Sequence, residues 1–411
     1  MNRVVVPLLV AHVFSLLGFA TYAAVLPLLE QEWQMSNTEA GWVASAFFVG
    51  YVATVSTASA LTDRIDARRV YFVGALFAAS SSFLFAWAAH GVVTAILAQA
   101  LLGAGNAATY MPGLRMLADR GAGENQSRYI SFYTSFFGIG VACSLWFAGH
   151  AVGAIGWRLT FAASGAGPLL AAALVAVATR GIPLSVASPS ARGPLWSQLL
   201  PLRAWKEVLA DRNCLTYTLG YAFHCLELFG MRAWMVAFLD HAASVAGGPQ
   251  ILLPVTIAAA GSIVSAPSSI LGNELALKVG RRRWIHLVMR TASFVGVVMA
   301  ISAQVSWALA VVLVFVYGMG VMADSATLTA GLVAAAPQRI KGAALGLYSF
   351  AGFGVGGITG PALFGATLDI AGAWPSASWA LAFLALGLPC FLFPWIDTRL
   401  HGAGPARVGE E

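Results

Sequence analysis

Hydrophobic residues in this chain form long, nearly uninterrupted runs separated by short polar segments, rather than the strict alternation of half-buried strands. A helix needs roughly 20 apolar residues to cross the hydrocarbon core of a bilayer. Runs of that length occupy approximately 4–29, 40–61, 70–89, 92–117, 129–152, 159–179, 214–239, 251–271, 285–303, 307–335, 343–368 and 377–396. They are too long for barrel strands, and lipid offers no partner to an unpaired backbone amide. The pattern therefore predicts an all-α membrane protein with twelve transmembrane helices.

One long polar stretch, 181–213, divides these runs into two sets of six. It is rich in Pro, Ser, Arg and Gly, which is typical of a linker. We expect an N-terminal six-helix bundle at 1–180 and a C-terminal six-helix bundle at 214–398. A short tail follows at 399–411.

Composition supports a membrane protein and excludes a soluble one, because 59% of residues are hydrophobic, 10% are charged and the mean hydropathy is +0.78. With the N-terminus inside, the cytoplasmic loops and adjoining turns hold all of the 23 Lys and Arg except Arg158 and Arg232. Both termini are then cytoplasmic. The net charge of +6 is therefore an orientation signal spread over several loops, and no nucleic-acid partner is expected.

The two halves repeat each other. The segment DRIDARR at 63–69, between the second and third runs, has a counterpart in LALKVGRRR at 275–283. The fourth runs share a Gly-x-Gly at the same point, in Leu101–Pro112 and Val316–Thr327. These correspondences indicate a duplicated bundle.

A resemblance to the major facilitator superfamily follows from these segments and covers the chain from the first run to about Trp395. The signature of that family between its second and third helices is Gly-x-x-x-Asp-Arg-x-Gly-Arg-Arg. The positions that fit it are Asp63, Arg64, Arg68 and Arg69, and those that depart are Ser59, Asp66 and Ala67. Gly156-Trp157-Arg158, at the start of the sixth run, is similar to another frequent element of the family.

The resemblance implies a monomeric, bacterial inner-membrane transporter that works by alternating access. It also implies a gating role for the basic loops, in which Asp63 pairs near Arg120 or Arg128 and Leu277 replaces the second Asp. The gating residues are then Asp63, Arg64, Arg68, Arg69, Arg128, Arg281 and Arg282. The alternative is that these charges only set the orientation. An Arg that many proton-coupled relatives carry in the fourth helix is Gln99 here, which excludes coupling through that residue.

Ionisable residues inside the membrane concentrate on the seventh run, where His224, Glu227 and Arg232 lie between Asn213 and Asp240. Each costs at least ~2.5 kcal/mol at mid-depth and tends to face a cavity. At 100° per residue the three span an arc of about 140°. We expect Glu227 to carry a proton that His224 shares, and Arg232 to bind an anionic group of the substrate. The alternative is a fixed ion pair within the bundle.

Further candidates lie on other runs. Asp324, in the tenth run, either joins Glu227 and His224 in proton coupling or forms a fixed pair with Arg290. A lone membrane histidine such as His12 is either a substrate ligand or a packed residue. The expected substrate-binding residues are Arg232, His12, Asn106, Tyr110, Tyr133 and Tyr221.

Nothing in the sequence resembles an enzyme site: a phosphate-binding loop and a His-Glu-x-x-His motif are both missing. The four cysteines lack the spacing of a metal or redox motif, and we expect neither cofactor nor metal. The expected function is secondary active transport of a small polar or anionic solute coupled to protons, with membrane lipid as the other partner. The alternatives are a proton-driven exporter of drugs or metabolites and a non-transporting membrane receptor.

Overall fold

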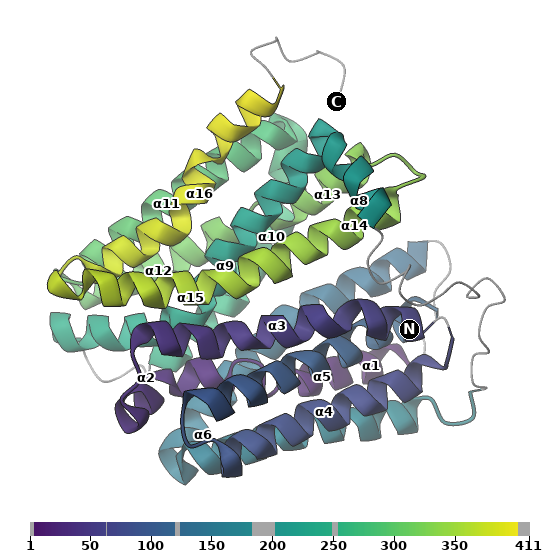
Figure 1. Ribbon diagram of the computed structural model, residues 1–411, viewed down its shortest axis with the longest axis horizontal. Coiled ribbons are helices and arrows are strands. Elements are labelled where there is room, and N and C mark those ends of the chain that lie inside the picture. Colours follow the sequence, from purple (N-terminus) through teal and green to yellow (C-terminus); the bar gives the residue numbers. More distant parts are fainter. Residues whose placement is uncertain (1–3, 63, 120–123, 183–201, 249–253, 402–411) are drawn as a thin grey trace. The chain divides into compact units, whose positions relative to one another are not determined.

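The computed structural model describes residues 4–62, 64–119, 124–182, 202–248 and 254–401. Every regular element in these ranges is a helix (Figure 1). Ten of the described helices are long and apolar enough to cross a membrane, and one shorter apolar helix precedes them. The prediction of an all-α membrane protein is confirmed.

Residue contacts divide the chain into two compact units. Unit 1 consists of Met1–Met35, Trp42–Leu200 and Leu253–Ser262. Unit 2 consists of Ser36–Gly41, Pro201–Leu252 and Ile263–Glu411. Apart from the short segments Ser36–Gly41 and Leu253–Ser262, this division follows the two halves of the sequence. The helix that contains most of each short segment is described with the unit that holds the rest of that helix. Each unit is described by itself below.

The helices of unit 1 are packed pairwise, with α4 against α5 and α6, and both α1 and α2 against α6. Their bounds are α1 Val5–Ser15, α2 Thr21–Trp33, α3 Asn37–Leu61, α4 Ala67–Ala88, α5 Val92–Ala118 and α6 Glu124–Ala178. The element α6 contains two predicted spans, separated at Gly156, where φ is 75° and ψ is 164°. This left-handed backbone favours glycine, which explains the residue at that turn.

The first predicted span is not one continuous helix. It is interrupted between α1 and α2, where the backbone forms turns over 16–20. Ser144 of α6 bonds the interrupted backbone, because its hydroxyl accepts from the amide of Ala20 at 3.0 Å and donates to the carbonyl of Leu17 at 2.6 Å. Non-helical backbone at membrane depth is tolerated when protein groups satisfy it in this way.

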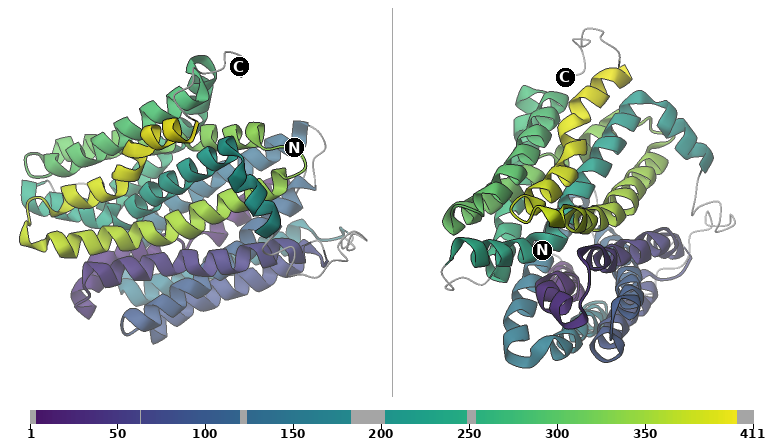
Figure 2. Two further views of the ribbon diagram at one scale, coloured as in Figure 1. Left: turned by 45° about the horizontal axis from the view of Figure 1, so that its top comes forward. Right: turned by 60° about the vertical axis from the view of Figure 1, so that its left-hand side comes forward.

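The helices of unit 2 pack around α9, which contacts α12, α13, α15 and α16, while α11 runs beside α16 (Figure 2). Their bounds are α8 Leu202–Ala210, α9 Arg212–Ala246, α10 Pro254–Val279, α11 Arg281–Ser302, α12 Trp307–Met322, α13 Ser325–Ala335, α14 Lys341–Ser349, η1 Phe350–Gly356, α15 Gly357–Ile370, η2 Ala371–Ala373 and α16 Ser378–His401. The short helix α8 lies in the segment predicted as a linker, and α9 begins at Arg212, two residues before the predicted bundle.

Two predicted spans of unit 2 are also irregular. The tenth is broken between α12 and α13, and Asp324 is the residue that precedes α13. The eleventh contains a π-helical segment, η1, over Phe350–Gly356. Short π segments inside α-helices occur frequently at functional sites.

Glycines bring α15 and η1 close to α9. A methyl group added at Gly356 would overlap the carbonyl of Ala222, and one at Gly360 would overlap the carbonyl of Leu226. Such close approach of membrane helices requires small residues at the contact. It fixes the position of the α9 segment that carries the charged residues described next.

Candidate functional site

Glu227 lies in the interior of unit 2. Its side chain is 2% exposed, and its Oε1 accepts a hydrogen bond of 3.1 Å from the hydroxyl of Tyr317 on α12. Tyr317 is itself completely buried. Tyr317 was not among the site residues predicted from the sequence, although it lies in the repeated Gly-x-Gly segment of the fourth span in the second half.

His224 contacts the second buried acid. Its Nδ1 lies 2.8 Å from Oδ1 of Asp324, and both side chains are about as buried as Glu227. The expected alternative, a pair between Asp324 and Arg290, is not formed: Arg290 is exposed and its guanidinium lies 6.0 Å from the ring centroid of Phe391. Asp324 occupies the break between α12 and α13, so its carboxylate lies at the positive end of the α13 dipole.

Arg232 is half-buried on α9, and within the described residues it forms no ion pair. The carboxyl groups of Glu227 and Asp324 are directed to Tyr317 and His224 instead. The fixed ion pair that the sequence left open between Glu227 and Arg232 is therefore not present. A guanidinium on a membrane-spanning helix is costly without a counter-ion, so this geometry leaves Arg232 available to an anion.

Tyr221 joins this group through its ring. It is stacked on Tyr348 at a centroid distance of 3.8 Å and lies parallel to the His224 imidazole at 5.8 Å. The Tyr348 hydroxyl is 2.9 Å from that of Thr329 on α13. The π-helical segment η1 approaches the same ring, because a methyl group at Gly352 would overlap Tyr221. Tyr221 of α9 therefore contacts α14 and η1, and Tyr348 of α14 extends the group to α13.

The candidates of the first half lie together in unit 1. The imidazole of His12 is stacked on the ring of Tyr133 at 4.0 Å with an interplanar angle of 16°, and the ring of Tyr110 lies 5.4 Å from it. Tyr133 donates a hydrogen bond to the carbonyl of Tyr110 at 3.2 Å. Asn106 is buried one helical turn before Tyr110 on α5.

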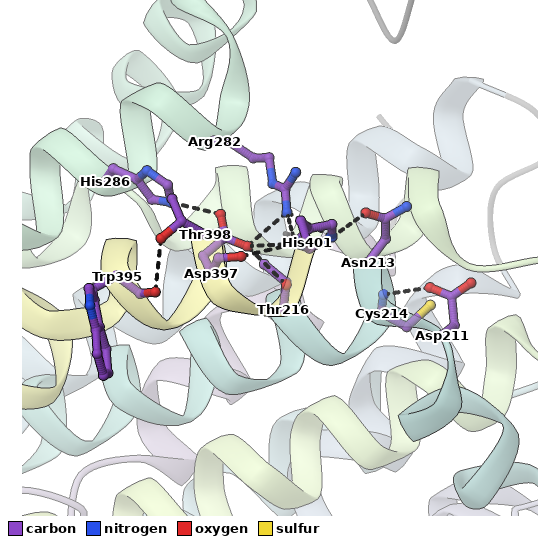
Figure 3. Close-up of polar contacts among 10 residues, drawn as sticks. All are labelled: Asp211, Asn213, Cys214, Thr216, Arg282, His286, Trp395, Asp397, Thr398 and His401. Carbon is purple, nitrogen blue, oxygen red and sulfur yellow. Dashed lines mark hydrogen bonds and ion pairs between the residues drawn. The ribbon is translucent and has the colours of Figure 1, made fainter. Parts of the chain in front are cut away.

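A second polar cluster lies at the basic end of unit 2, the end that carries the arginines at the start of α11 (Figure 3). Asp397 of α16 is 3% exposed and is its centre. Its Oδ1 lies 2.7 Å from Arg282 and accepts from Thr216 at 3.0 Å, whereas its Oδ2 lies 2.9 Å from His286. His401 lies 3.2 Å from the same carboxylate. One carboxylate thus holds α9, α11 and α16 together.

Unit 1 has a related arrangement at the start of α4. Asp66 accepts from the backbone amide of Arg68 at 2.8 Å, and the Arg68 guanidinium contacts the same carboxylate at 2.8 Å. That guanidinium also donates to the carbonyls of Thr179 and Ile182, beyond the end of α6. In both units an arginine at the start of the third span therefore binds the end of the sixth.

The gating prediction is only partly described by the structure. Asp63 and the side chain of Arg128 lie outside the described residues, whereas Arg68 and Arg282 take part in the contacts above. Arg64 and Arg281 are half-buried and Arg69 is exposed. Sequence reasoning missed Asp66, which appeared only as a departure from the signature, and Asp397, which lies at the end of the last apolar run.

Among the described residues, no group of three or more His, Cys, Asp or Glu side chains has the arrangement of a metal site. The groups paired around Glu227 and His224 are carboxyl, imidazole and phenol groups, which hold and exchange protons. The chemistry that these groups support is proton binding, on the same helix as a guanidinium that has no acidic partner among the described residues.

Solved structures with a similar fold include transport proteins. A bacterial homologue of the human lysosomal transporter Spinster, in an inward-facing and unoccupied conformation, has a TM-score of 0.79 and 15% identity, with 98% of this chain and 99% of that chain covered. The nucleoside transporter NupG has a TM-score of 0.76 and 14% identity over 98% of this chain and 100% of its own. Tetrameric PepTSo2 has a TM-score of 0.73 and 14% identity over 97% and 98%. At these identities the likeness shows the fold alone.

The search of curated proteins found no match. A family profile described as the Major Facilitator Superfamily matches residues 8–351, which is most of the chain and covers parts of both units. The helices, their two-unit arrangement and the profile agree with the resemblance found in the sequence. The chain therefore belongs to the Major Facilitator Superfamily, and it is a multi-pass membrane protein of the secondary-transporter class.

Proposed function

We propose that this secondary transporter moves a small polar or anionic solute and couples its movement to protons. The observation that carries the proposal is the state of two acids in unit 2. Glu227 and Asp324 are buried on membrane-spanning helices, and within the described residues neither contacts Arg or Lys. Their partners are a phenol hydroxyl and an imidazole.

These partners suit proton exchange. An ionised carboxylate without a nearby cation costs on the order of 2.5 kcal/mol or more inside a bilayer. A proton bound to Glu227 removes the charge and therefore this cost. The pair of His224 and Asp324 stays neutral overall when it shares one proton. In this proposal the buried acids of unit 2 are proton-binding sites. Glu227 gains or loses its proton when a conformational change exposes it to water. Coupling then requires only that the loaded solute and the proton favour the same conformation.

Arg232 supplies the solute-binding charge in this proposal. It has no acid partner in the described part of unit 2, and its planar guanidinium matches carboxylate or phosphate groups with two parallel hydrogen bonds. Tyr221 is the neighbouring ring on α9 toward the basic end. His12, Asn106, Tyr110 and Tyr133 complete the proposed substrate-binding set from unit 1.

The test is an internal-pH measurement in proteoliposomes during a screen of small polar and anionic solutes. Wild-type protein should acidify the lumen only in the presence of a transported solute. Glu227→Gln keeps the size of the side chain but cannot exchange a proton, so it should abolish solute-driven acidification and proton-driven accumulation while counterflow exchange remains. Glu207→Gln is the matched control, because Glu207 is exposed on α8 and pairs with Arg339.

Accumulation at the wild-type level in Glu227→Gln would overturn the proton-coupling assignment. Flux without any change in pH, and unaffected by Arg232→Gln, would instead indicate an exporter or facilitator that does not use this cluster. Ligand binding with no flux in any direction would indicate the receptor alternative.

The remaining parts of the proposal concern the whole molecule. The bodies that move are the two six-helix halves, 1–180 and 214–398, joined by the linker at 181–213. The protein lies in a bacterial inner membrane, and the basic end of each unit faces the cytoplasm. The contacts of Arg68 and Arg282 belong to the gate. The protein acts as a monomer without enzymatic activity. Cysteine labelling from each side of the membrane tests the orientation, and light scattering of the purified protein tests the monomer.

A further inference from the structure

His12 has an unusual environment in unit 1. Its side chain is 1% exposed, yet neither Nδ1 nor Nε2 has a hydrogen-bond partner in the described part of the chain. Its aromatic neighbours are the rings of Tyr133, Tyr110 and Phe137. Buried polar groups without partners are rare because the lost contacts with water are not replaced, so each one requires an explanation.

A second unpartnered group lies on α5, the helix that carries Tyr110. Asn106 is 2% exposed, and both its amide nitrogen and its amide oxygen lack partners among the described residues. Residues four apart on a helix share a face, so Asn106 lies on the face of α5 that carries Tyr110. Tyr110 contacts the His12 ring, so Asn106 lies one helical turn from a residue that contacts His12. We treat the two unpartnered side chains together and call them the His12–Asn106 site.

The backbone next to this site is also specialised. Helix α1 ends at Ser15, three residues after His12, and the turns that follow are bonded to Ser144. The interruption is therefore supported by another helix and is part of the fold. Interrupted helices near the middle of a bundle are where secondary transporters place bound solutes.

The hydrogen-bonding capacity of the site limits what it recognises. A neutral imidazole offers one donor and one acceptor, and an amide offers donors and an acceptor side by side. A carboxylate has only acceptors and would leave the acceptors of His12 and Asn106 unpaired. A ligand edge with adjacent N–H and C=O groups pairs both kinds. The rings of Tyr110, Tyr133 and Phe137 pack against one another and around His12, so the surroundings of the site are aromatic, which suits a planar ring better than an aliphatic group.

From this juxtaposition we infer that the His12–Asn106 site binds a planar heterocycle with a lactam-type edge, that is, neighbouring N–H and C=O groups. The bound ring is taken to be part of the transported solute, and in this respect the inference rests on the proposed function. It assigns ring recognition to unit 1, separately from the proton-binding residues of unit 2.

The experiment uses the purified full chain and follows thermal unfolding with four probes. Uracil and hypoxanthine carry a lactam edge, 1,3-dimethyluracil has a ring without N–H donors, and benzoate has a ring with only a carboxylate. Uracil or hypoxanthine should raise the midpoint of unfolding, and the two other probes should not. The same result should hold in Glu227→Gln, because that residue belongs to unit 2.

Two substitutions separate a binding role from a structural one. His12→Phe keeps a ring stacked on Tyr133, and Asn106→Leu keeps the approximate volume, while each removes unpartnered polar atoms. Both should unfold at or above the wild-type temperature without a probe, yet weaken lactam binding at least tenfold. Thr218→Val is the matched control: it removes a buried, unpartnered hydroxyl from α9 in unit 2 and should leave probe binding unchanged.

The inference is overturned if neither lactam probe stabilises the protein, or if benzoate or 1,3-dimethyluracil does so equally well. It is also overturned if both substitutions lower the unfolding temperature and leave probe binding intact, since the two residues would then be structural. Probe binding without any flux would count against the proposed transport function alone. Transport of a solute without a lactam edge, together with no lactam binding, would leave transport standing and remove this inference.

Discussion

Replacement of Asp397 by asparagine tests the polar cluster at the basic end of unit 2. The change keeps the size of the side chain but removes the charge that Arg282 and His286 contact. Removing one partner of a buried ion pair costs about 3–5 kcal/mol, because the other charge is left unpaired. The Arg282 side chain is 41% exposed and that of His286 is 23% exposed, so water replaces part of the lost interaction. We therefore expect a loss of about 2–3 kcal/mol in the free energy of unfolding.

The assay is denaturant unfolding in detergent micelles, arranged as a double-mutant cycle with Asp397→Asn, Arg282→Gln and the combined variant. The pair should show a coupling energy of about 1–2 kcal/mol, since the two groups are in direct contact. Glu207→Gln serves as the control, because its ion pair with Arg339 is exposed and should be worth about 0–1 kcal/mol.

A coupling energy near zero, or a loss in Asp397→Asn no larger than that in Glu207→Gln, would refute the reasoning. Either result would mean that Asp397 does not hold the ends of α11 and α16 together in the folded protein.

Three further outcomes follow from the structure. Tyr317→Phe removes the hydroxyl that donates to Glu227, so it should lower proton-driven accumulation in proteoliposomes. It should cost only about 1 kcal/mol in the free energy of unfolding. Unchanged accumulation would contradict the role of that hydrogen bond. Arg232→Gln should weaken binding of a transported anion at least tenfold, which corresponds to about 1.4 kcal/mol. Arg232→Lys keeps the positive charge and should retain part of the binding affinity. Equal affinities of wild type and both variants, measured by calorimetry, would exclude the anion contact. Gly360→Ala should destabilise the protein by about 1–3 kcal/mol in denaturant unfolding, because its methyl group meets the α9 backbone, whereas Gly261→Ala, with open space around it, should not.

The residues of the candidate site were found in the sequence because ionisable groups inside apolar runs are costly and therefore stand out. His224 and Glu227 were both identified in this way. Their contact partners could not be identified in this way, because a helical wheel gives the direction of a side chain but not the residues of other helices that it contacts. At about 60° apart on α9, the two residues contact different neighbours, Asp324 and Tyr317. Those contacts depend on how α12 and α13 pack against α9.

For the cluster around Asp397, too, the sequence predicted only some of the residues that are in contact. The basic loop before α11 was identified in the sequence, but its acidic partner lies more than one hundred residues later, at the end of the last apolar run. Nothing in the local sequence relates Asp397 to Arg282. The corresponding role of Asp66 was hidden because the family signature has a different residue type at that position.

The sequence by itself determined the all-α membrane class, the positions of the long apolar segments and the family. It could do so because a bilayer requires long apolar helices with internally satisfied backbones, and this requirement acts on each segment separately. Only the tertiary structure decided where those helices are interrupted. The turn after Ser15 is bonded by Ser144 of α6, and the break before α13 depends on groups such as Trp284 of α11, which donates to the carbonyl of Ala323. Such breaks need partners on other helices to satisfy the freed backbone groups, so they are a property of the packed bundle and not of any single run.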